Sequence, residues 1–308
     1  MLANQAQLLR LLLVILALCP VAATATDPGA AAAPAADKLQ LASVHALVLD
    51  LESGETLYAK RSDVPVPIAS ITKLMTALVA LDAGQPLNEW LPIVGWDRDV
   101  DKNAYSRLRI GSEARRADLI RIALMSSENL ATNVLAHHYP GGVDRFVAAM
   151  NAKAESLGMS RTHFVDPAGL SPENRSTAAD LGRMVRAAYG DDHIREYSTS
   201  YQYTVQFRSP RYTLGYGNTN PLVASNRWEL ALSKTGYLNE AGRCLTLITR
   251  IDSDPVAIVL LNSFGKRTPL GDAGRIRRWL TTGSGGAVAA PALDYERRVA
   301  RTLEGRDI

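Results

Sequence analysis

A run of helix-forming residues from Ser70 to Ala83 constrains this chain most, because it is apolar and yet begins with Ser70-Ile-Thr-Lys73. The run ends beside Gly84, which is typical of a helix C-terminus, so the pattern predicts a buried helix. Residues three apart share one face of a helix, and Lys73 therefore lies beside Ser70. A serine hydroxyl needs a neighbouring base to act as a nucleophile, and a buried lysine can supply one. The same spacing also fits a helix N-cap followed by a solvated lysine.

The composition is that of an ordinary globular protein: 308 residues, 47% hydrophobic and 21% charged. The length allows one large domain or two small ones. The formal net charge is +3 and no dense block of lysine and arginine occurs. We therefore expect no nucleic-acid partner. The sequence also contains no glycine-rich phosphate loop, so we expect no nucleotide and no other cofactor.

The N-terminus has the features of a secretory signal peptide over residues 1–25. An apolar run covers 8–18, and the small residues 23–25 offer a cleavage site. The alternative is an uncleaved anchor, but the run is shorter than the roughly 20 residues that a membrane span needs. Leu18 is not the small residue that a lipoprotein site at Cys19 would require. We expect a mature protein outside the cytoplasm with no transmembrane span.

The mature chain is expected to form one α+β domain over residues 38–282. A flexible leader rich in Ala, Pro and Gly precedes it at 26–37. A C-terminal tail, or a frayed helix, follows at 283–308, and its apolar stripe is too thin for a membrane anchor. Strand signals at both ends of the domain, with helical patterns between them, predict a sheet lobe and a helical lobe with a cleft between them. The expected strands are 43–51, 56–60, 201–207, 230–234, 243–251 and 255–261, and the expected helices are 70–83, 116–125, 130–139, 143–157, 177–189 and 272–280.

Two polar clusters stand where such a cleft would need them. Ser126-Ser-Glu-Asn129 connects two helical patterns and can point a hydroxyl and an amide into the cleft, although Ser and Asn are also common helix caps. Lys234-Thr-Gly236 follows an apolar strand pattern. There, a cation, a hydroxyl and a glycine can hold a carboxylate. Taken alone, this triplet is also an ordinary turn-like strand end.

The three clusters together resemble a known motif set. S-x-x-K, S-x-N and K-T-G occur in this order in serine penicillin-binding proteins and β-lactamases. Over about 41–280 the chain resembles low-molecular-mass penicillin-binding proteins of the D-alanyl-D-alanine carboxypeptidase/endopeptidase family, peptidase S11. The stretches that carry this resemblance are 67–76, 164–170, 176–181 and 218–223. Within the family, 124–129, 137–142 and 234–244 resemble the penicillin-binding protein 7/8 subgroup, which cuts D-alanyl-diaminopimelate cross-links.

This resemblance implies a β-lactamase/D,D-peptidase (transpeptidase-like) fold, in which an antiparallel sheet lobe packs with helices and carries an inserted helical lobe. It implies a periplasmic enzyme, soluble or loosely associated with the membrane, that acts on the peptide cross-links of peptidoglycan. β-Lactam antibiotics are its expected covalent inhibitors. Since few residues follow 280, we expect no second β domain of the kind that many carboxypeptidases in the family carry. No protein partner is identified by the sequence.

The resemblance also implies roles for individual residues. Ser70 attacks the carbonyl that follows a D-alanine and forms an acyl-enzyme, which water then hydrolyses. Lys73 accepts the proton of Ser70, although the identity of the base is disputed among related enzymes. Ser127 relays a proton toward the leaving amine, and Asn129 holds the substrate backbone.

The remaining roles concern the substrate carboxylate and the oxyanion. Lys234 supplies a positive field, Thr235 donates to the carboxylate, and Gly236 leaves room for the ligand. The backbone N–H groups of Ser70 and Tyr237 form the oxyanion hole. Arg243 is a further candidate partner for the carboxylate; without the resemblance it is an ordinary arginine on a strand surface.

Three other functions share these motifs or this fold. A β-lactamase of class A uses a glutamate between S-x-N and K-T-G to drive deacylation, and the interval 166–174 lacks that pattern, so we expect penicillin to leave Ser70 slowly. A D-alanyl-D-alanine carboxypeptidase has the same catalytic residues. A non-catalytic β-lactam or peptidoglycan sensor is the more distant alternative, against which the complete motif set argues.

Two remaining features are expected to be structural. Cys244 is the only cysteine after residue 25 and has apolar neighbours, which favours a buried strand residue over a catalytic one. His137 and His138 are adjacent, so on a helix they point about 100° apart and do not chelate together. With no H-E-x-x-H motif in the sequence, we expect no metal site.

Overall fold

The computed structural model describes residues 34–97, 105–225 and 227–304. These residues belong to one compact unit. The expected signal peptide and residues 26–33 of the expected leader lie outside the described residues. None of the helices in the described ranges is long and apolar enough to cross a membrane.

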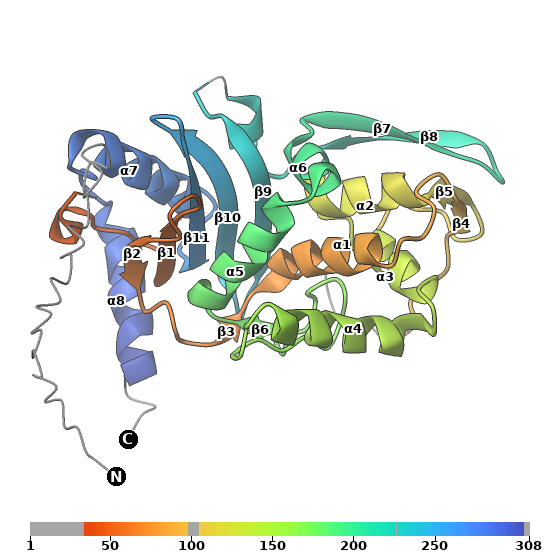
Figure 1. Cartoon of the computed structure of the whole chain (residues 1–308), viewed down its shortest axis with the longest axis horizontal. Helices are drawn as coiled ribbons and strands as arrows, with labels where there is room; N and C mark the ends of the chain where they lie inside the picture. Colours follow the sequence, from red (N-terminus) through yellow and green to blue (C-terminus); the bar gives the residue numbers. More distant parts are fainter. Residues whose placement is uncertain (1–33, 98–104, 226, 305–308) are drawn as a thin grey trace, which may run out of the picture. The chain divides into compact units, whose positions relative to one another are not determined.

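A five-stranded antiparallel sheet forms one lobe, in the order β2-β1-β11-β10-β9 (Figure 1). Its first two strands are the hairpin expected from the sequence, and its last three come from the C-terminal third of the chain. The sheet therefore joins both ends of the domain, as the strand signals predict. The strands are β1 (His45–Asp50), β2 (Thr56–Lys60), β9 (Leu230–Leu238), β10 (Gly242–Ile251) and β11 (Asp254–Ser263).

Both faces of this sheet are buried. Side chains of successive residues in a strand point to opposite faces, and here each set packs in a different hydrophobic cluster. Ala257, Val259 and Leu261 of β11 pack in one hydrophobic cluster together with Leu181 and Val185 of α5. The residues between them, such as Ile258 and Leu260, pack in a second cluster with Ile276 and Trp279 of α7. Helices α5 (Ala178–Tyr189) and α7 (Thr268–Thr282) flank the sheet in Figure 1.

The second lobe is helical, and its residues lie in the sequence between β2 and β9, the two strands at the edges of the sheet. It contains α1 (Thr72–Asp82), α2 (Arg116–Met125), α3 (Asn129–His137), α4 (Gly142–Ser156) and α6 (Asp192–Thr199). Short elements connect these helices: η2 (Ala69–Ile71), β3 (Val66–Pro67), β4 (Trp90–Pro92), β5 (Glu113–Arg115), β6 (Arg175–Ser176), β7 (Gln202–Phe207), β8 (Tyr212–Gly217) and η3 (Pro221–Ala224). The expected division into a sheet lobe and a helical lobe is confirmed.

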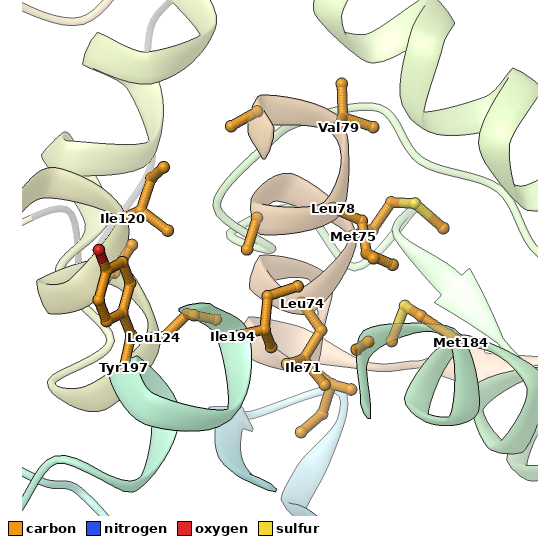
Figure 2. Close-up of a cluster of buried hydrophobic side chains, with 14 of the residues drawn as sticks. Ile71, Leu74, Met75, Leu78, Val79, Ile120, Leu124, Met184, Ile194 and Tyr197 are labelled. Atoms are coloured by element: carbon orange, nitrogen blue, oxygen red, sulfur yellow. The ribbon is translucent and has the colours of Figure 1, made fainter. Parts of the chain in front are cut away.

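Helix α1 is the centre of the helical lobe and contacts all five helices from α2 to α6. Figure 2 shows Leu74, Met75 and Leu78 of α1 among side chains of the neighbouring helices. Every residue from Thr72 to Ala80 is buried, including Lys73. Because apolar side chains surround it on all sides, α1 holds its own N-terminus, and with it Ser70, in a fixed position.

Among the elements that were not expected from the sequence are α6 and β8. α6 is mostly polar and buries only Ile194, Tyr197 and Ser198. β8 contains Gly215 and Gly217, which weaken a strand pattern, and it forms because it pairs with β7 along its whole length.

The segment 283–308, expected to be a tail, contains helix α8 (Ala290–Glu304), which packs beside β2. Its buried residues are Ala292, Glu296 and Ala300, which are four apart and form one narrow stripe. The Glu296 Oε1 forms salt bridges with a guanidinium nitrogen of Arg61 at 2.6 Å and with the Lys60 Nζ at 3.1 Å. The sequence pattern, which indicates a tail or a frayed helix, understates this helix because the centre of its buried stripe is a charged residue.

The packing of α1 gives a stability prediction. Leu74→Ala removes a side chain that is 0% exposed, so we expect the free energy of unfolding in urea to fall by about 2–5 kcal/mol. Ile110→Ala is the control, since Ile110 is 70% exposed, and its effect should stay within about 0.5 kcal/mol. Equal losses in the two variants would contradict the central position of α1.

Candidate active site

Ser70 lies in the 3-10 turn η2 directly before α1, and Lys73 is the second residue of α1. The Lys73 Nζ is 2.8 Å from the Ser70 Oγ, so the expected pair is formed. The alternative of an N-cap with a solvated lysine is wrong, because Ile71 is the N-cap, no side chain caps the helix, and Lys73 is 0% exposed.

The contacts of Lys73 can be made by the charged ammonium, with three donors, and also by a neutral amine. Besides Ser70, its Nζ has two neighbours that only accept hydrogen bonds, the Asn129 Oδ1 at 2.8 Å and the Ala168 carbonyl oxygen at 2.5 Å. A neutral amine has two N–H donors and one lone pair. If the two donors bind Asn129 and Ala168, the lone pair faces the hydroxyl of Ser70 and can accept its proton.

Burial makes the neutral form of Lys73 available near neutral pH. It lowers the pKa of Lys73 from its usual value to about 7, because removal from water disfavours the charged form. The carboxylates of Asp166 and Glu128 act in the opposite direction and offset only part of this shift. Lys73 therefore titrates near neutral pH, where a general base is most effective.

The loop after His163 supplies the carbonyl that holds Lys73. The Asp166 carboxylate accepts hydrogen bonds from the backbone N–H groups of Ala168, Gly169, Leu170 and Ser171, at 2.6–3.2 Å. This one carboxylate ties the loop into a tight turn and aims the Ala168 carbonyl at the amine. The buried Asn174 ties the same loop to α1, since its amide donates to the Thr72 Oγ1 and to the Asp166 carbonyl.

Gly169 is the point where this loop touches the nucleophile segment. Its φ is +74°, and a Cβ at this position would lie 2.1 Å from the Ala69 carbonyl oxygen. Ala69 itself has φ 48°, a left-handed conformation that costs a non-glycine residue about 1–2 kcal/mol. The contact with Gly169 holds this strained backbone, which carries Ser70, in place.

The connector between α2 and α3 brings the second motif to the site, as expected. Ser127 has φ 59°, another strained conformation, and its Oγ accepts a hydrogen bond from the Lys234 Nζ at 3.0 Å. Asn129 begins α3 and reaches Lys73. The cap of α3 is Glu128, whose carboxylate accepts from the Ala131 N–H, so the alternative of a purely capping cluster is wrong for Ser127 and Asn129.

Lys234 lies inside β9, which continues to Leu238, and the expectation that the strand ends at K-T-G is therefore wrong. The extension forms because β10 pairs with β9 up to Leu238. Lys234 is buried, and its Nζ also donates to the Thr235 carbonyl at 2.9 Å. Burial lowers its pKa, and the nearby charge of Lys73 lowers it further. Loss of the Lys73 proton removes that repulsion and favours the charged form of Lys234.

Gly236 places β9 against the nucleophile turn. A Cβ there would lie 3.1 Å from the Ile68 carbonyl oxygen and 3.2 Å from the Ser70 nitrogen. The glycine is thus needed first for contact between two segments of the protein itself. Beside it, the Thr235 hydroxyl donates to the Thr219 Oγ1 at 2.7 Å.

One cavity of about 520 Å³ opens onto these groups. Ser70, Ser127, Thr235, Gly236, Tyr237 and Arg243 all line it. The Arg243 guanidinium lies 3.7 Å from the centre of the Tyr237 ring, a cation–π contact, so Arg243 is held at the cavity and is not a free surface side chain.

The surroundings of Cys244 and of the adjacent His137 and His138 fit the structural roles expected from the sequence. Cys244 is buried in β10, and burial raises the pKa of its thiol to about 12, which removes the thiolate needed for nucleophilic attack. His137 contacts the Asp97 carboxylate, and His138 contacts the Pro92 carbonyl, so the pair does not act jointly. Within the described ranges, no group of three His, Cys, Asp or Glu residues could hold a metal ion.

A family model described as peptidase S11, D-alanyl-D-alanine carboxypeptidase, matches residues 30–265. The chain belongs to this family. It is 48% identical over 274 residues to a D-alanyl-D-alanine endopeptidase of Pseudomonas aeruginosa, covering 89% of this chain and 88% of the relative. An endopeptidase of the same name from Escherichia coli is 46% identical, with 89% and 88% covered.

Solved structures agree on the fold. A single-residue mutant of the Streptomyces K15 DD-transpeptidase has a TM-score of 0.72 at 26% identity, covering 79% of this chain and 99% of that one. Penicillin-binding protein D2 of Listeria monocytogenes, in its cefotaxime-bound form, has a TM-score of 0.67 at 28% identity, with 77% and 96% covered. The expected β-lactamase/D,D-peptidase fold is confirmed, and this family member is a serine peptidase.

Sequence reasoning assigned no role to several residues of the site of this peptidase. The stretch 164–170 contributes to the family resemblance and the interval 166–174 shows that the glutamate pattern is missing, but neither gives a role to Asp166, Ala168 or Asn174. The signal that could have found them is the dense polar and turn-forming pattern of Asp166-Pro-Ala-Gly169, which marks a tight turn stabilised by an Asp side chain. What the pattern does not give is the contact of this turn with Lys73.

The close contact at Gly169 gives a second prediction. Gly169→Ala must displace the Ala69 backbone, and a displacement of this kind near the reacting atoms costs about 100-fold in rate. We expect acylation of Ser70 by a fluorescent penicillin to slow by that factor. Gly142→Ala is the control, since Gly142 has the same φ of +74° but open space at its Cβ. Wild-type acylation rates in both variants would contradict the proposed role of this contact.

Proposed function

We propose that this protein is a D,D-endopeptidase that cleaves D-alanyl cross-links of peptidoglycan through an acyl-enzyme on Ser70. The observation that carries the proposal is the convergence of a paired nucleophile and base, Ser70 and Lys73, with a hydroxyl on a buried cation, Ser127 and Lys234, at one cavity. This constellation can perform both proton transfers of acyl transfer.

In the first half-reaction, the Ser70 Oγ attacks the carbonyl carbon of the D-alanine residue, and the proton of Ser70 passes to the Lys73 Nζ. The tetrahedral intermediate collapses with loss of the peptide nitrogen. That nitrogen must gain a proton to leave. Ser127 donates it, and the Lys234 ammonium, whose Nζ is 3.0 Å from the Ser127 Oγ, replaces the proton that Ser127 gives up. Water then attacks the ester carbonyl, its proton returns through Ser127 to Lys234, and Lys73 returns a proton to the Ser70 Oγ as the ester bond breaks.

The edge of β9 supplies the electrostatics for these steps. The backbone N–H groups of Ser70 and Tyr237 stabilise the oxyanion, and loss of one such donor costs about 100- to 1000-fold in rate. The hydroxyl of Thr235 and the guanidinium of Arg243 bind the carboxylate beside the scissile nitrogen. The negative charge of a bound carboxylate also opposes the effect of burial on the pKa of Lys234 and favours its charged form.

Two observations favour the endopeptidase over the carboxypeptidase. The relatives that are 48% and 46% identical are named endopeptidases, whereas the carboxypeptidase DacA of Escherichia coli is 29% identical and this chain spans about half of its length. The cavity of about 520 Å³ is also far larger than one departing D-alanine needs, and its size is that of a site for a drug-sized ligand.

The proposed location is the periplasm, where peptidoglycan lies, with residues 1–25 removed as a signal peptide. β-Lactams are the proposed covalent inhibitors, since penicillin-binding protein D2 is described in cefotaxime- and ampicillin-bound forms. Slow loss of penicillin from Ser70 stays a prediction. It is supported by the exposure of Glu173 and by the engagement of both Asp166 oxygens with backbone N–H groups.

The function is tested by digesting purified muropeptides and identifying the products by mass spectrometry. We expect wild-type protein to convert cross-linked dimers to monomers and Ser70→Ala to leave them intact. Release of free D-alanine from pentapeptides without loss of dimers would indicate a carboxypeptidase instead. No hydrolysis of either substrate by a protein that penicillin still acylates would indicate a sensor.

A further inference from the structure

The cavity at Ser70 continues past Arg243 to the turn that joins β11 to α7. Lys266 and Arg267 of this turn line its far end. The sheet brings them there, because Arg243 of β10 is paired with Ser263, the last residue of β11, and the turn begins at the next residue. The known motifs account for the near end of the cavity and leave this far end without a role.

The charge of the far end is unbalanced. Arg243, Lys266 and Arg267 are the cations among the residues that line the cavity, and those lining residues include no carboxylate. Lys266 and Arg267 are both exposed, and in the part of the chain that the structure describes neither forms a salt bridge. Two adjacent cations without an anionic partner, at the end of a cavity that begins at the nucleophile, are placed to attract an anion.

The part of the cavity lining beside Arg243 and this turn is apolar. Leu245, Pro269 and Leu270 line the cavity together with the thiol-bearing Cys244, which is buried. An aliphatic chain can lie on such a wall, whereas a strongly hydrated chain would lose water there without compensation. The cavity therefore suits a ligand with an anion at each end and methylene groups between them.

The turn that carries the two cations is held from behind by α8. The Tyr295 hydroxyl donates to the Asn262 Oδ1 at 2.6 Å, and its ring packs against Phe264 at a centroid distance of 5.4 Å. Gly242 lies against the same place, since a Cβ there would be 2.7 Å from the Asn262 Oδ1. Contacts at Asn262 and Phe264 therefore fix the start of the turn that carries Lys266 and Arg267.

We propose that Lys266 and Arg267 form a leaving-group subsite for a second carboxylate, separated by an aliphatic chain from the carboxylate next to the scissile nitrogen. The proposal rests on the endopeptidase function and names its substrate class. The acceptor stem of a cross-link carries such a second carboxylate at its end, whereas a departing D-alanine has only one. The subsite therefore selects cross-linked substrates over free pentapeptides.

The test is a cycle of two substrates and three proteins. The substrates are synthetic cross-linked peptides whose acceptor stem ends in a free carboxylate or in a primary amide. The proteins are the wild type, the double variant Lys266→Gln/Arg267→Gln, and the control Arg278→Gln/Arg301→Gln. The control removes the same charge from two exposed arginines, on α7 and α8, that do not line the cavity.

We expect the wild type and the control to cleave the carboxylate substrate about tenfold more efficiently in kcat/KM than the amide substrate, as two partly exposed charge pairs allow. In the double variant the ratio should approach one. The wild-type ratio should also shrink at about 1 M salt, which screens exposed charges. An equal ratio in the wild type and the double variant overturns the subsite.

A second readout separates this proposal from the endopeptidase function. The isolated acceptor stem, with a free carboxylate or an amide end, competes with a fluorescent penicillin for acylation of Ser70. About tenfold better competition by the carboxylate form, lost in the double variant, supports the subsite even if no dimer is cleaved. Equal competition by the two forms overturns it, whether or not the wild type cleaves cross-links.

Discussion

The buried amine of Lys73 is the interaction on which the site depends. It contacts Ser70 of the nucleophile turn, Asn129 of α3 and the Ala168 carbonyl of the 164–171 loop. Three segments that are far apart in the chain therefore meet at one nitrogen atom. Because the interior disfavours the charged form, the same burial that joins the segments also gives the amine a pKa close to neutral.

Much of the surrounding structure keeps this amine in place. Asp166 fixes the loop with four backbone hydrogen bonds, and α1 is packed by helices on every side. The left-handed conformations of Ala69 and Ser127 are strained, and strained backbone persists only where its surroundings determine it fully. Both flank the cavity, so the stability of the two lobes maintains an arrangement of the site that the local sequence disfavours.

The sequence predicted the elements whose pattern is local. The hairpin, the buried helix after Ser70 and the connector at 126–129 follow from periodicity and turn residues, and the order of three motifs pointed to the family. Long-range contacts were not predictable in this way. The Ala168 carbonyl reaches Lys73 across 95 residues of sequence. Helix α8 packs through a buried glutamate that pairs with Lys60, the last residue of β2, and with Arg61 directly after it. The sequence correctly indicated that Gly236 belongs to the site. The contact that requires a glycine there, however, is with the backbone of Ile68 and Ser70 and not with a ligand.

The central claim is that Lys73 reacts as a neutral amine, and the pH dependence of acylation tests it most directly. The second-order rate of acylation of Ser70 by a fluorescent penicillin would be measured from pH 5 to pH 9. Because the pKa of Lys73 is lowered to about 7, the neutral fraction grows with pH, and the rate should rise about tenfold per pH unit below that value and level off above it. A rate that is independent of pH across this range, or that falls as pH rises through 7, would contradict the account.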